Sequence, residues 1–195
     1  MKRYLKAGEK LLLNHPFYKD WESGRLSERD LAIYSAEYEH FIKGILPLAW
    51  KELRYNNIYE EELEHAELWK VFGNSVNYTP TKTPQTDGMK RLIQKFNSIK
   101  HNKPSLIGFL YAFEHQQPEV SKSKLQGLEK WFNIPDKGKE YFLLHARNTE
   151  EKGILENLIN SMNNDEFSKC EETFEETINI LWDVLTDIQN LCLKG

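Results

Sequence analysis

Apolar residues recur at three- and four-residue intervals along most of this 195-residue chain, which is the spacing of amphipathic α-helices. The longest such pattern predicts a helix over about Asp165–Leu193, with its apolar positions on one face. Strand-like alternation is scarce, and the one Asp-Gly dipeptide, Asp87-Gly88, precedes a helical pattern instead of a second strand. The pattern therefore predicts an all-α bundle of about seven or eight helices.

Residues that interrupt helices divide this pattern into separate elements. Pro16 follows a first helix, Gly24 ends a short second one, and Ser27 has the N-cap position of a third. The expected helices cover about 2–13, 17–22, 28 to beyond 47, 59–72, 88–101, 105–132, 136–162 and 165–193. Residues 73–87 are rich in threonine and proline and predict a loop, of a length at which loops tend to be functional or mobile.

Length, charge, hydropathy and cysteine content limit the number of domains, the kinds of partner and the cellular compartment that we expect. Residues 1–195 are expected to form one domain. The net charge is −4 with both signs mixed, so no nucleic-acid partner is predicted. No apolar run approaches the roughly 18 residues of a membrane span, so no membrane association is predicted. Cys170 and Cys192 would lie about 33 Å apart on one helix, beyond disulfide reach, which predicts buried free thiols and a cytoplasmic protein.

A carboxylate stands at an expected break in the middle of the chain. Glu114 lies four residues before Pro118, inside an apolar helical segment. Proline has no N–H and its ring clashes with the carbonyl of the residue four positions back, so the helix should kink at Glu114. The alternative is a core helix with one exposed glutamate, and the segment alone leaves both interpretations open.

Two further helical segments each contain a histidine that could bind a metal. Glu61 and His65 are one helical turn apart, which is half of a bundle-type metal site, although a dense acidic run also fits a solvated face. His145 follows four large apolar residues and is either a ligand or a hydrogen-bonded core histidine. The combined set, which suits iron or manganese, is Glu60 or Glu61, His65, Glu114 and His145.

Four motifs in order along the chain carry a family resemblance. They are His15-Pro16-Phe17-Tyr18, residues 65–72 with their Leu-Trp pair, residues 111–119 and residues 141–145. They resemble the TenA/PqqC superfamily of heme-oxygenase-like helical proteins, and within it the CADD-like group of 4-aminobenzoate synthases and di-metal oxidases. The resemblance covers nearly the whole chain. It implies a heme-oxygenase-like bundle, a homodimer, and a dinuclear metal centre that activates O2.

The resemblance also assigns metal ligands residue by residue. Glu114 and His145 match the group's pattern directly, and His65 matches through the Leu-Trp motif. The group's first glutamate falls at Ile58, and a two-residue deletion would bring Glu60 into register. The implied iron or manganese ligands retained here are therefore Glu60, His65, Glu114 and His145.

Two ligand positions depart from the group's pattern. Thr149 stands where the group has an aspartate, and Lys152 stands where it has a second histidine. The departure predicts one metal held by about four residues, or loss of the metal. Lys152 is then expected to project into the old site as a counter-ion beside Glu114, unless its helix turns it to solvent.

The CADD-like resemblance further implies two self-modified residues. Tyr18 matches the tyrosine that supplies the aromatic ring of the product, and Lys124 matches the lysine that donates the amino group; the alternatives are an aromatic core anchor and an exposed helix lysine. The first functional hypothesis is an O2-dependent oxidase that makes 4-aminobenzoate. The second is a metal-free relative that binds a small aromatic or heterocyclic ligand, or a protein partner. The TenA nucleophile has no match at Cys170 or Cys192, which argues against thiaminase activity.

Overall fold

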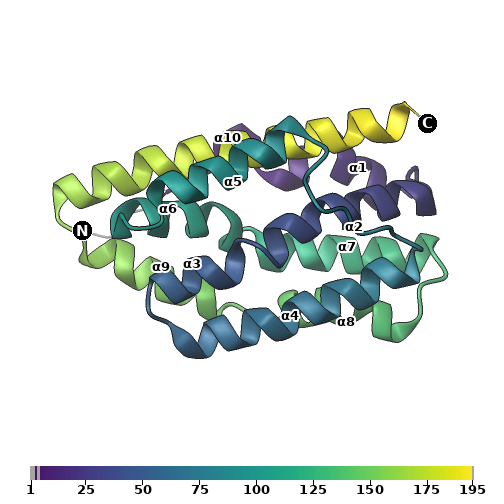
Figure 1. Ribbon diagram of the computed structural model, residues 1–195, viewed down its shortest axis with the longest axis horizontal. Coiled ribbons are helices and arrows are strands. Elements are labelled where there is room, and N and C mark those ends of the chain that lie inside the picture. The colour runs from purple at the N-terminus through teal and green to yellow at the C-terminus, as the bar shows by residue number, and fades with distance from the viewer. Residues whose placement is uncertain (1–2, 4, 195) are drawn as a thin grey trace.

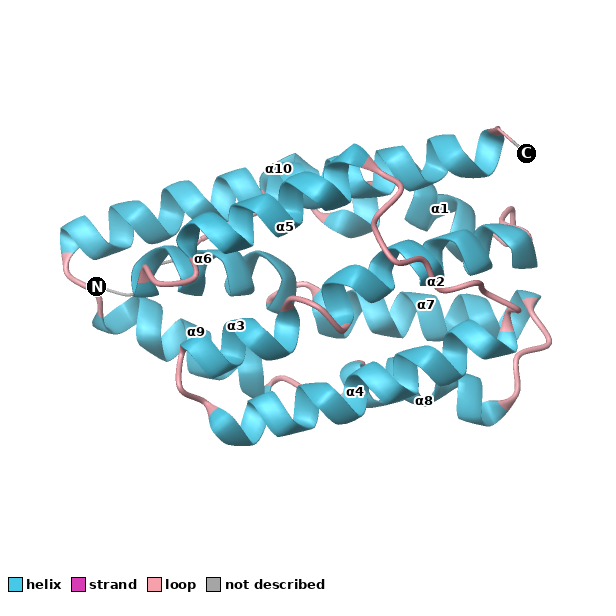
Figure 2. Cartoon of the chain, in the orientation of Figure 1, coloured by secondary structure: helices cyan, strands magenta, loops and turns pink. Residues whose placement is uncertain are grey.

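The computed structural model describes residue 3 and residues 5–194 of the chain. Within this part every regular element is a helix (Figures 1 and 2). The α-helices are α1 (Pro16–Glu22), α2 (Glu28–Ile42), α3 (Leu46–Glu52), α4 (Asn56–Ser75), α5 (Asp87–Ile99), α6 (Lys103–Glu114), α7 (Gln117–Trp131), α8 (Asp136–His145), α9 (Glu150–Ser161) and α10 (Asn164–Leu193). The described part therefore has more and shorter helices than the periodicity predicts, because several expected helices are divided.

The N-terminal segment is one place where the expected helix, over 2–13, is wrong. Its described part contains two short 3-10 turns, η1 (Gly8–Lys10) and η2 (Leu12–Asn14). Gly8 has a φ of 59°, in the left-handed region that glycine adopts readily, and this conformation interrupts an α-helix. Residues 2 and 4 of the expected helix lie outside the described residues.

Prolines divide two of the expected long helices. α2 ends at Ile42 instead of continuing beyond Pro47, which lies in the first turn of α3, where its missing N–H needs no partner. α6 ends at Glu114 and α7 begins at Gln117, because Pro118 cannot donate a hydrogen bond to the Glu114 carbonyl. The predicted kink is thus a complete break between two helices.

The expected helix over 136–162 is also divided, and this break orients the candidate site. α8 ends at His145 and α9 begins at Glu150. The side-chain oxygen of Asn148 accepts a hydrogen bond from the Glu150 N–H at 2.9 Å. That bond satisfies a donor at the start of α9, which a continuous helix would have bonded to the backbone.

The helices are arranged so that α6 lies inside the molecule. α10 and α5 run along one side, α4 and α8 along the opposite side, and α2, α6 and α7 lie between them (Figure 1). The side chains of α6 are buried from Ser105 to Glu114. Gly108 permits the close approach of α6 to α10, because a Cβ there would lie 2.1 Å from the Cys170 carbonyl oxygen. The C-terminal end of α6 consequently presents Glu114 to the core.

The loop between α4 and α5 is held by a buried carboxylate of α2. Glu37 is 2% exposed and accepts hydrogen bonds from the backbone N–H groups of Gln85 and Thr86 and from the Thr86 hydroxyl. The Thr86 hydroxyl in turn caps α5 by accepting from the Met89 N–H. This loop, over residues 76–86, is therefore fixed to the bundle at its C-terminal end.

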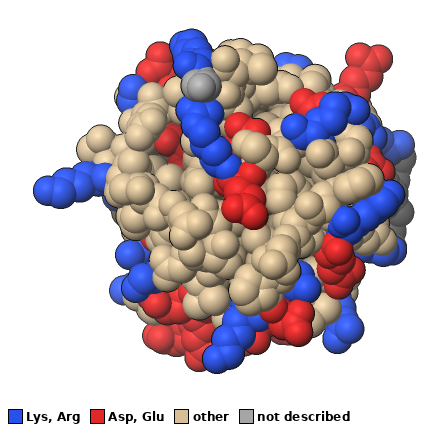
Figure 3. Space-filling view, turned by 90° about the vertical axis from the view of Figure 1, so that its right-hand side faces the viewer, with Lys and Arg blue, Asp and Glu red and all other residues tan. Residues whose placement is uncertain are grey.

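Surface charge and the cysteines agree with the compositional expectations. At the end of the molecule drawn in Figure 3, acidic and basic side chains are interspersed with uncharged surface. Among the described residues, no helix combines the length and the apolar character needed to cross a membrane. Cys170 and Cys192 are both free, as predicted from their spacing, but only Cys170 is buried as expected, and Cys192 is partly exposed.

Candidate metal centre

A carboxylate and an imidazole of α4 point into the core from one helix face. The buried positions of α4 include Ile58, Glu62, His65, Trp69 and Phe72, which are separated by alternating four- and three-residue steps. Glu62 is 1% exposed and His65 is 5% exposed. Glu60 and Glu61 are exposed, so Glu62 corrects the sequence prediction of Glu60. The phase of the stripe was a partial signal, because Glu62 is four residues after Ile58 and seven before Trp69; Glu61 also fits this helical spacing, and only the packing selects Glu62.

His145, at the end of α8, meets this pair. Its ring centroid lies 4.6 Å from that of His65, in an edge-to-face arrangement. One ligand atom each from Glu62, His65 and His145 lie within 4.8 Å of one another, and all three residues are buried. Two histidines and one carboxylate are the donor set of many mononuclear non-heme iron oxygenases. These three residues therefore form a candidate metal triad.

Hydrogen bonds fix which ring nitrogen of each histidine is available. His145 Nδ1 lies 2.8 Å from the Tyr141 carbonyl oxygen, and His65 Nδ1 lies 3.3 Å from Glu62 Oε1. Since oxygen acceptors require an N–H at Nδ1, the Nε2 lone pair of each ring is left free. Metal-binding histidines in proteins are held in this way through their other nitrogen.

The two imidazoles have opposite shifts in pKa. Burial, and then the nearby charges of His65 and Lys124, lower the pKa of His145 to about 3. Burial also disfavours the charged form of His65, but the hydrogen bond and the negative charge of Glu62 outweigh burial and raise its pKa. His145 is consequently neutral at pH 7, which is the form that binds a metal.

Two further carboxylates are buried beside the triad. Glu114, at the end of α6, is 5% exposed, and Glu151, in the first turn of α9, is 6% exposed. Burial, and then the charges of Glu62 and Glu151, raise the pKa of Glu114 well above its usual value. Burial and the charge of Glu62 likewise raise the pKa of Glu151. We call Glu62, His65, Glu114, His145 and Glu151 together the carboxylate–histidine cluster.

Unsatisfied oxygens indicate that this cluster fits a cation. Glu62 Oε2 and Glu114 Oε1 are buried and have no hydrogen-bond partner. Buried polar atoms normally have partners, so unpartnered carboxylate oxygens inside a set of nitrogen and oxygen donors are available to a bound cation. The donors present suit iron or manganese better than a soft, thiolate-binding metal.

The two positions that depart from the CADD-like pattern lie outside the cluster. Thr149 is exposed and precedes α9, and Lys152 is partly exposed. Lys152 forms no ion pair with Glu114 in the described part of the chain, and its charge acts instead on His115, lowering that pKa. The expectation that Lys152 projects into the site as a counter-ion is wrong, because the break before α9 turns the neighbouring Glu151 inward.

Tyr18 and Lys124, the two residues predicted to be self-modified, are buried among aromatic side chains. Lys124 is 5% exposed, and its amine lies 4.7 Å from the ring centroid of Tyr18 and 4.8 Å from that of Tyr34. The amine donates a hydrogen bond to the Tyr34 hydroxyl, which lies 3.2 Å from the Tyr18 hydroxyl. The interpretation of Lys124 as an exposed helix lysine is therefore wrong. We call Tyr18, Trp21, Tyr34, Tyr38, Lys124 and Phe142 the lysine–aromatic cluster.

Burial favours the neutral forms of the ionisable groups in this cluster. It lowers the pKa of Lys124 well below the usual value for an amine. It raises the pKa values of Tyr18 and Tyr34 well above the usual value for a phenol. An uncharged amine beside protonated phenols is a nucleophilic nitrogen in a site of low polarity.

Tyr141 connects the two clusters. Its ring stacks on His145, with centroids 4.1 Å apart, and meets the Trp69 ring edge at 4.9 Å. Its hydroxyl accepts a hydrogen bond from Gln117 Nε2 at 3.1 Å. Burial, and then the charges of Glu62 and Glu114, raise its pKa. The contacts place Tyr141 between the carboxylate–histidine cluster and the lysine–aromatic cluster.

Several of these residues escaped the sequence prediction. Tyr34 and Tyr38 were not singled out among the candidate residues, and Gln117 and Tyr141 entered only as members of the family motifs. Repeated tyrosine on a buried stripe was the available signal, because buried hydroxyls need hydrogen-bond partners. For Glu151 the sequence offered no comparable signal until the break between α8 and α9 was known.

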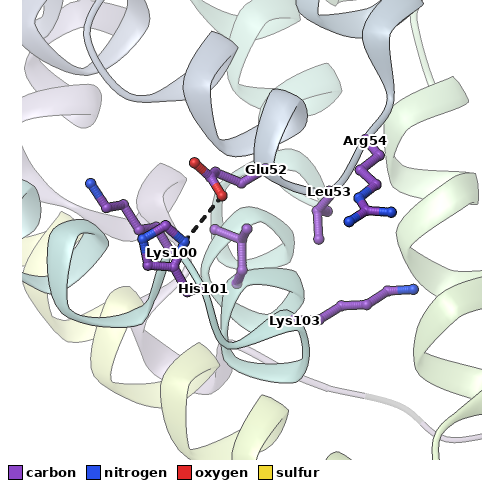
Figure 4. A pocket seen from close by; sticks show the side chains of 7 residues that line it. Glu52, Leu53, Arg54, Lys100, His101 and Lys103 are labelled. Atoms are coloured by element: carbon purple, nitrogen blue, oxygen red, sulfur yellow. Dashed lines mark hydrogen bonds and ion pairs between the residues drawn. The ribbon is translucent and has the colours of Figure 1, made fainter.

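A separate surface pocket lies between the end of α3 and the start of α6 (Figure 4). Its volume is about 450 Å³, and its charged lining includes Arg54, Lys100 and Lys103. Glu52 lies 3.3 Å from His101 across it. None of the residues of the two buried clusters lines this pocket, so the candidate chemistry is internal.

Sequence comparisons match the chain to redox enzymes. A family model described as an iron-containing redox enzyme matches residues 45–177. The 4-aminobenzoate synthase of Chlamydia pneumoniae is 26% identical to this chain, over an alignment that covers 92% of this chain and 89% of that protein. Both matches include α4, α6, α8 and α9, or the greater part of them, which carry the carboxylate–histidine cluster.

Solved structures match the chain over most of its length. A domain of unknown function with a heme oxygenase-like fold from Shewanella denitrificans has a TM-score of 0.74 and 16% identity, covering 93% of this chain and 87% of that one. A CADD-like protein of unknown function from Nostoc punctiforme has a TM-score of 0.69 and 13% identity, covering 95% and 88%. The predicted heme-oxygenase-like, all-α fold is thereby confirmed.

Proposed function

This chain belongs to the family of iron-containing redox enzymes, and we propose that it is a CADD-like, O2-dependent oxidase that makes 4-aminobenzoate. The observation that carries the proposal is the contact of two internal sites through one residue. The candidate metal triad and the lysine–aromatic cluster both adjoin Tyr141. Neither site alone would distinguish an oxidase from a binding protein.

The carboxylate–histidine cluster is the part that holds the metal. Glu62, His65 and His145 supply the nitrogen and oxygen donors, with Nε2 of both imidazoles free. Iron or manganese held there would supply the activation of O2, the oxidant that the reaction requires. Stacking of Tyr141 on His145 orients that imidazole and excludes water from one side of it.

The lysine–aromatic cluster is the part that holds the reacting groups of the chain. By resemblance to the CADD-like group, Tyr18 supplies the aromatic ring and Lys124 supplies the amino nitrogen. The structure supports this assignment through the 4.7 Å approach of the Lys124 amine to the Tyr18 ring. Burial lowers the pKa of that amine, which favours the uncharged form that can act as a nitrogen donor.

The packing of the core favours the chain's own residues as substrate over an external ligand. Tyr18 is 3% exposed and Lys124 is 5% exposed, and aromatic rings fill the space around them. The metal-free alternative was motivated by Thr149 and Lys152 in ligand positions. Since Glu151 enters the cluster in their place, that motivation no longer holds.

Compartment and assembly follow from the same proposal. Free thiols at Cys170 and Cys192 fit the reducing cytoplasm inferred from the sequence. The homodimer implied by the family resemblance is part of the proposal as well, and size-exclusion chromatography with light scattering tests it.

Isotope labelling tests the proposed reaction. Chain grown with ring-13C tyrosine and 15N lysine is loaded with iron and manganese and exposed to O2 with a reductant. We expect 4-aminobenzoate carrying both labels, in at most one equivalent per chain, together with a matching mass loss from the protein. The product and the intact chain are both measured by mass spectrometry.

Matched variants make this test specific. Tyr18→Phe and Lys124→Arg should reduce product to background, whereas Tyr55→Phe and Lys122→Arg should not change it. Tyr55 and Lys122 lie outside the two buried clusters. Unlabelled product, or equal yield from Tyr18→Phe and the unsubstituted chain, would contradict the proposal.

A further inference from the structure

Helix α1, which carries Tyr18, is too short to be stable by itself. It has seven residues, Pro16–Glu22, and isolated helices shorter than about 12–15 residues are marginal in water. The position of Tyr18 relative to Lys124 on α7 therefore depends on the contacts that hold α1 in place. Two tryptophans supply hydrogen bonds between these helices, one from each helix to the other.

The first tryptophan, Trp21 of α1, is bonded to the backbone of Lys124 itself. Its indole N–H donates to the Lys124 carbonyl oxygen at 3.1 Å, and its side chain is 1% exposed. Trp21 follows Tyr18 by three residues, so the two side chains are neighbours on one side of α1. This hydrogen bond therefore links the helical turn that carries Tyr18 directly to the residue that carries the amine.

The second tryptophan, Trp131 at the end of α7, bonds back to α1. Its indole N–H donates to the Glu22 carbonyl oxygen at 3.0 Å. Glu22 is the last residue of α1, and carbonyl groups at that end of a helix have no partner within it. The bond thus fixes the C-terminal end of α1 to α7. Because the Trp131 side chain is 45% exposed, it contributes less to the core than the buried Trp21 does.

Two glycines leave the space that these indoles occupy. A Cβ at Gly127 of α7 would lie 2.6 Å from Trp21 Cδ1, and a Cβ at Gly24 would lie 2.5 Å from Trp131 Cδ2. Gly24 also has a φ of 71°, which side chains rarely adopt. Glycine is unfavourable inside a helix, and the close approach of Trp21 to α7 explains its presence at position 127.

We propose that Trp21 and Trp131 are positioning residues for the proposed reaction, because together they hold α1 against α7 and so keep the Lys124 amine at the Tyr18 ring. The amine lies 4.7 Å from the centroid of that ring. A displacement of about 1 Å between reacting groups can slow a reaction by on the order of a hundredfold. The inference rests on the proposed function, since it concerns the placement of the same two reacting residues.

Two variants test this role in independent ways. Trp131→Phe removes an indole N–H and keeps an aromatic ring beside Gly24, whereas Gly127→Ala keeps both indoles and displaces Trp21. In the metal-loaded chain exposed to O2 with a reductant, each variant should form labelled 4-aminobenzoate at least about tenfold more slowly than the unsubstituted chain. Asn163→Ala, which removes the side-chain cap of α10, is the control for a general loss of stability and should leave the rate unchanged.

A second readout follows the position of the Lys124 amine without turnover. In metal-free chain grown with 13C-lysine, the surrounding aromatic rings should shift the ε-CH2 proton resonance of Lys124 upfield, and its absence from Lys124→Arg assigns it. We expect Trp131→Phe and Gly127→Ala to move this resonance towards that of exposed lysines, and Asn163→Ala to leave it in place. Circular dichroism and metal analysis establish that the variants are folded and equally loaded.

The outcomes separate the inference from the function on which it rests. Labelled product from Trp131→Phe at the rate of the unsubstituted chain would overturn the positioning role and leave the proposed function intact. A slower rate with an unmoved Lys124 resonance, or equal slowing in Asn163→Ala, would also overturn it, because the effect would not come from the position of the amine. If Gly127→Ala does not fold, Trp131→Phe decides alone. No labelled product from the unsubstituted chain would overturn the proposed function itself.

Discussion

Two buried regions of this bundle treat charge in opposite ways. The carboxylate–histidine cluster gathers Glu62, Glu114 and Glu151 with no lysine or arginine ion pair in the described part of the chain, and the lysine–aromatic cluster holds the Lys124 amine among rings with no carboxylate. An ion pair between the two regions would have neutralised both, as buried charges usually require. Tyr141 lies between them instead.

The separation has a chemical consequence on each side. Without a lysine partner, the carboxylates remain available to a metal cation. Burial lowers the pKa of the Lys124 amine, and with no carboxylate partner to oppose this shift the uncharged form is favoured. The comparison shows that a core can keep a buried amine apart from buried carboxylates when each group functions without an ion-pair partner.

The largest expected effect on stability comes from truncating Trp69, which packs against residues of both regions. Trp69 is fully buried and its ring lies 4.9 Å from Tyr141 and 5.7 Å from Tyr34. Trp69→Ala should lower the free energy of unfolding by about 3–5 kcal/mol, because a large cavity forms in the core. Urea denaturation measures this. Trp131→Ala, at a tryptophan that is 45% exposed, is the control, and an equal loss there would contradict the prediction.

Neutralising one carboxylate should have the next largest effect. The pKa of Glu114 is raised in the folded protein, so its contribution to stability is present at low pH and is lost as pH rises through that pKa. In metal-free protein at pH 7, Glu114→Gln should therefore stabilise the fold, by at least about 1.4 kcal/mol, the equivalent of one pKa unit. The same variant should bind less metal.

Denaturation of the metal-free and metal-loaded forms measures both the predicted gain in stability without metal and the predicted loss of stabilisation by metal. The exposed Glu64→Gln is the control and should change stability by less than about 0.5 kcal/mol. If Glu114→Gln destabilised the metal-free protein, the prediction that the buried Glu114 carboxylate destabilises the metal-free fold would be wrong.

The lysine–aromatic cluster should show the opposite dependence on pH. The pKa of Lys124 is lowered in the folded protein, so the unfolded chain binds more protons below the usual lysine pKa, and stability rises with pH. Relative to Lys124→Met, the metal-free protein should gain up to about 1.4 kcal/mol per pH unit between pH 7 and 9. Denaturation curves at three pH values measure the difference, with the exposed Lys122→Met as control. Parallel curves for the chain and Lys124→Met would rule out a neutral buried amine.

The smallest effect is expected at the residue that joins the regions. Tyr141→Phe removes the hydroxyl that accepts a hydrogen bond from Gln117, so it should cost about 1 kcal/mol of stability. Metal content should be unchanged, because the ring that stacks on His145 remains. Thermal unfolding and metal analysis test the two statements, with Tyr59→Phe as control. Loss of metal in Tyr141→Phe would mean that the hydroxyl itself supports the metal centre.

Local signals in the sequence were sufficient for most of the fold. Ser27 forms the predicted N-cap of α2, with a capping box to Asp30, and α10 covers almost the range that its periodicity predicts. Helix ends of this kind depend on nearby residues alone, so they can be read from sequence. The first segment failed because the positive φ of Gly8 has no obligatory sequence signal.

The candidate site was only partly accessible to the same reasoning. His65, Glu114 and His145 were predicted by motif and are all buried in one cluster. Glu60 was placed wrongly, because a shifted register seemed necessary, although the apolar stripe of α4 contains Glu62. Lys152 was placed wrongly because it occupies the position of a ligand in the family pattern, and that pattern carries no information on the break before α9. That break changes which of residues 136–162 face inward.

The sequence by itself determined the chemical inventory of this protein: the helices, the motifs that mark its family, and the acids, histidines, tyrosine and lysine near the site. Only the tertiary structure decided which member of each acidic run is buried. Adjacent helical residues point about 100° apart, so one break or one residue of register exchanges Lys152 for Glu151, or Glu60 for Glu62. That choice depends on how α4, α6, α8 and α9 meet, which is a property of packing between distant segments and not of any local pattern.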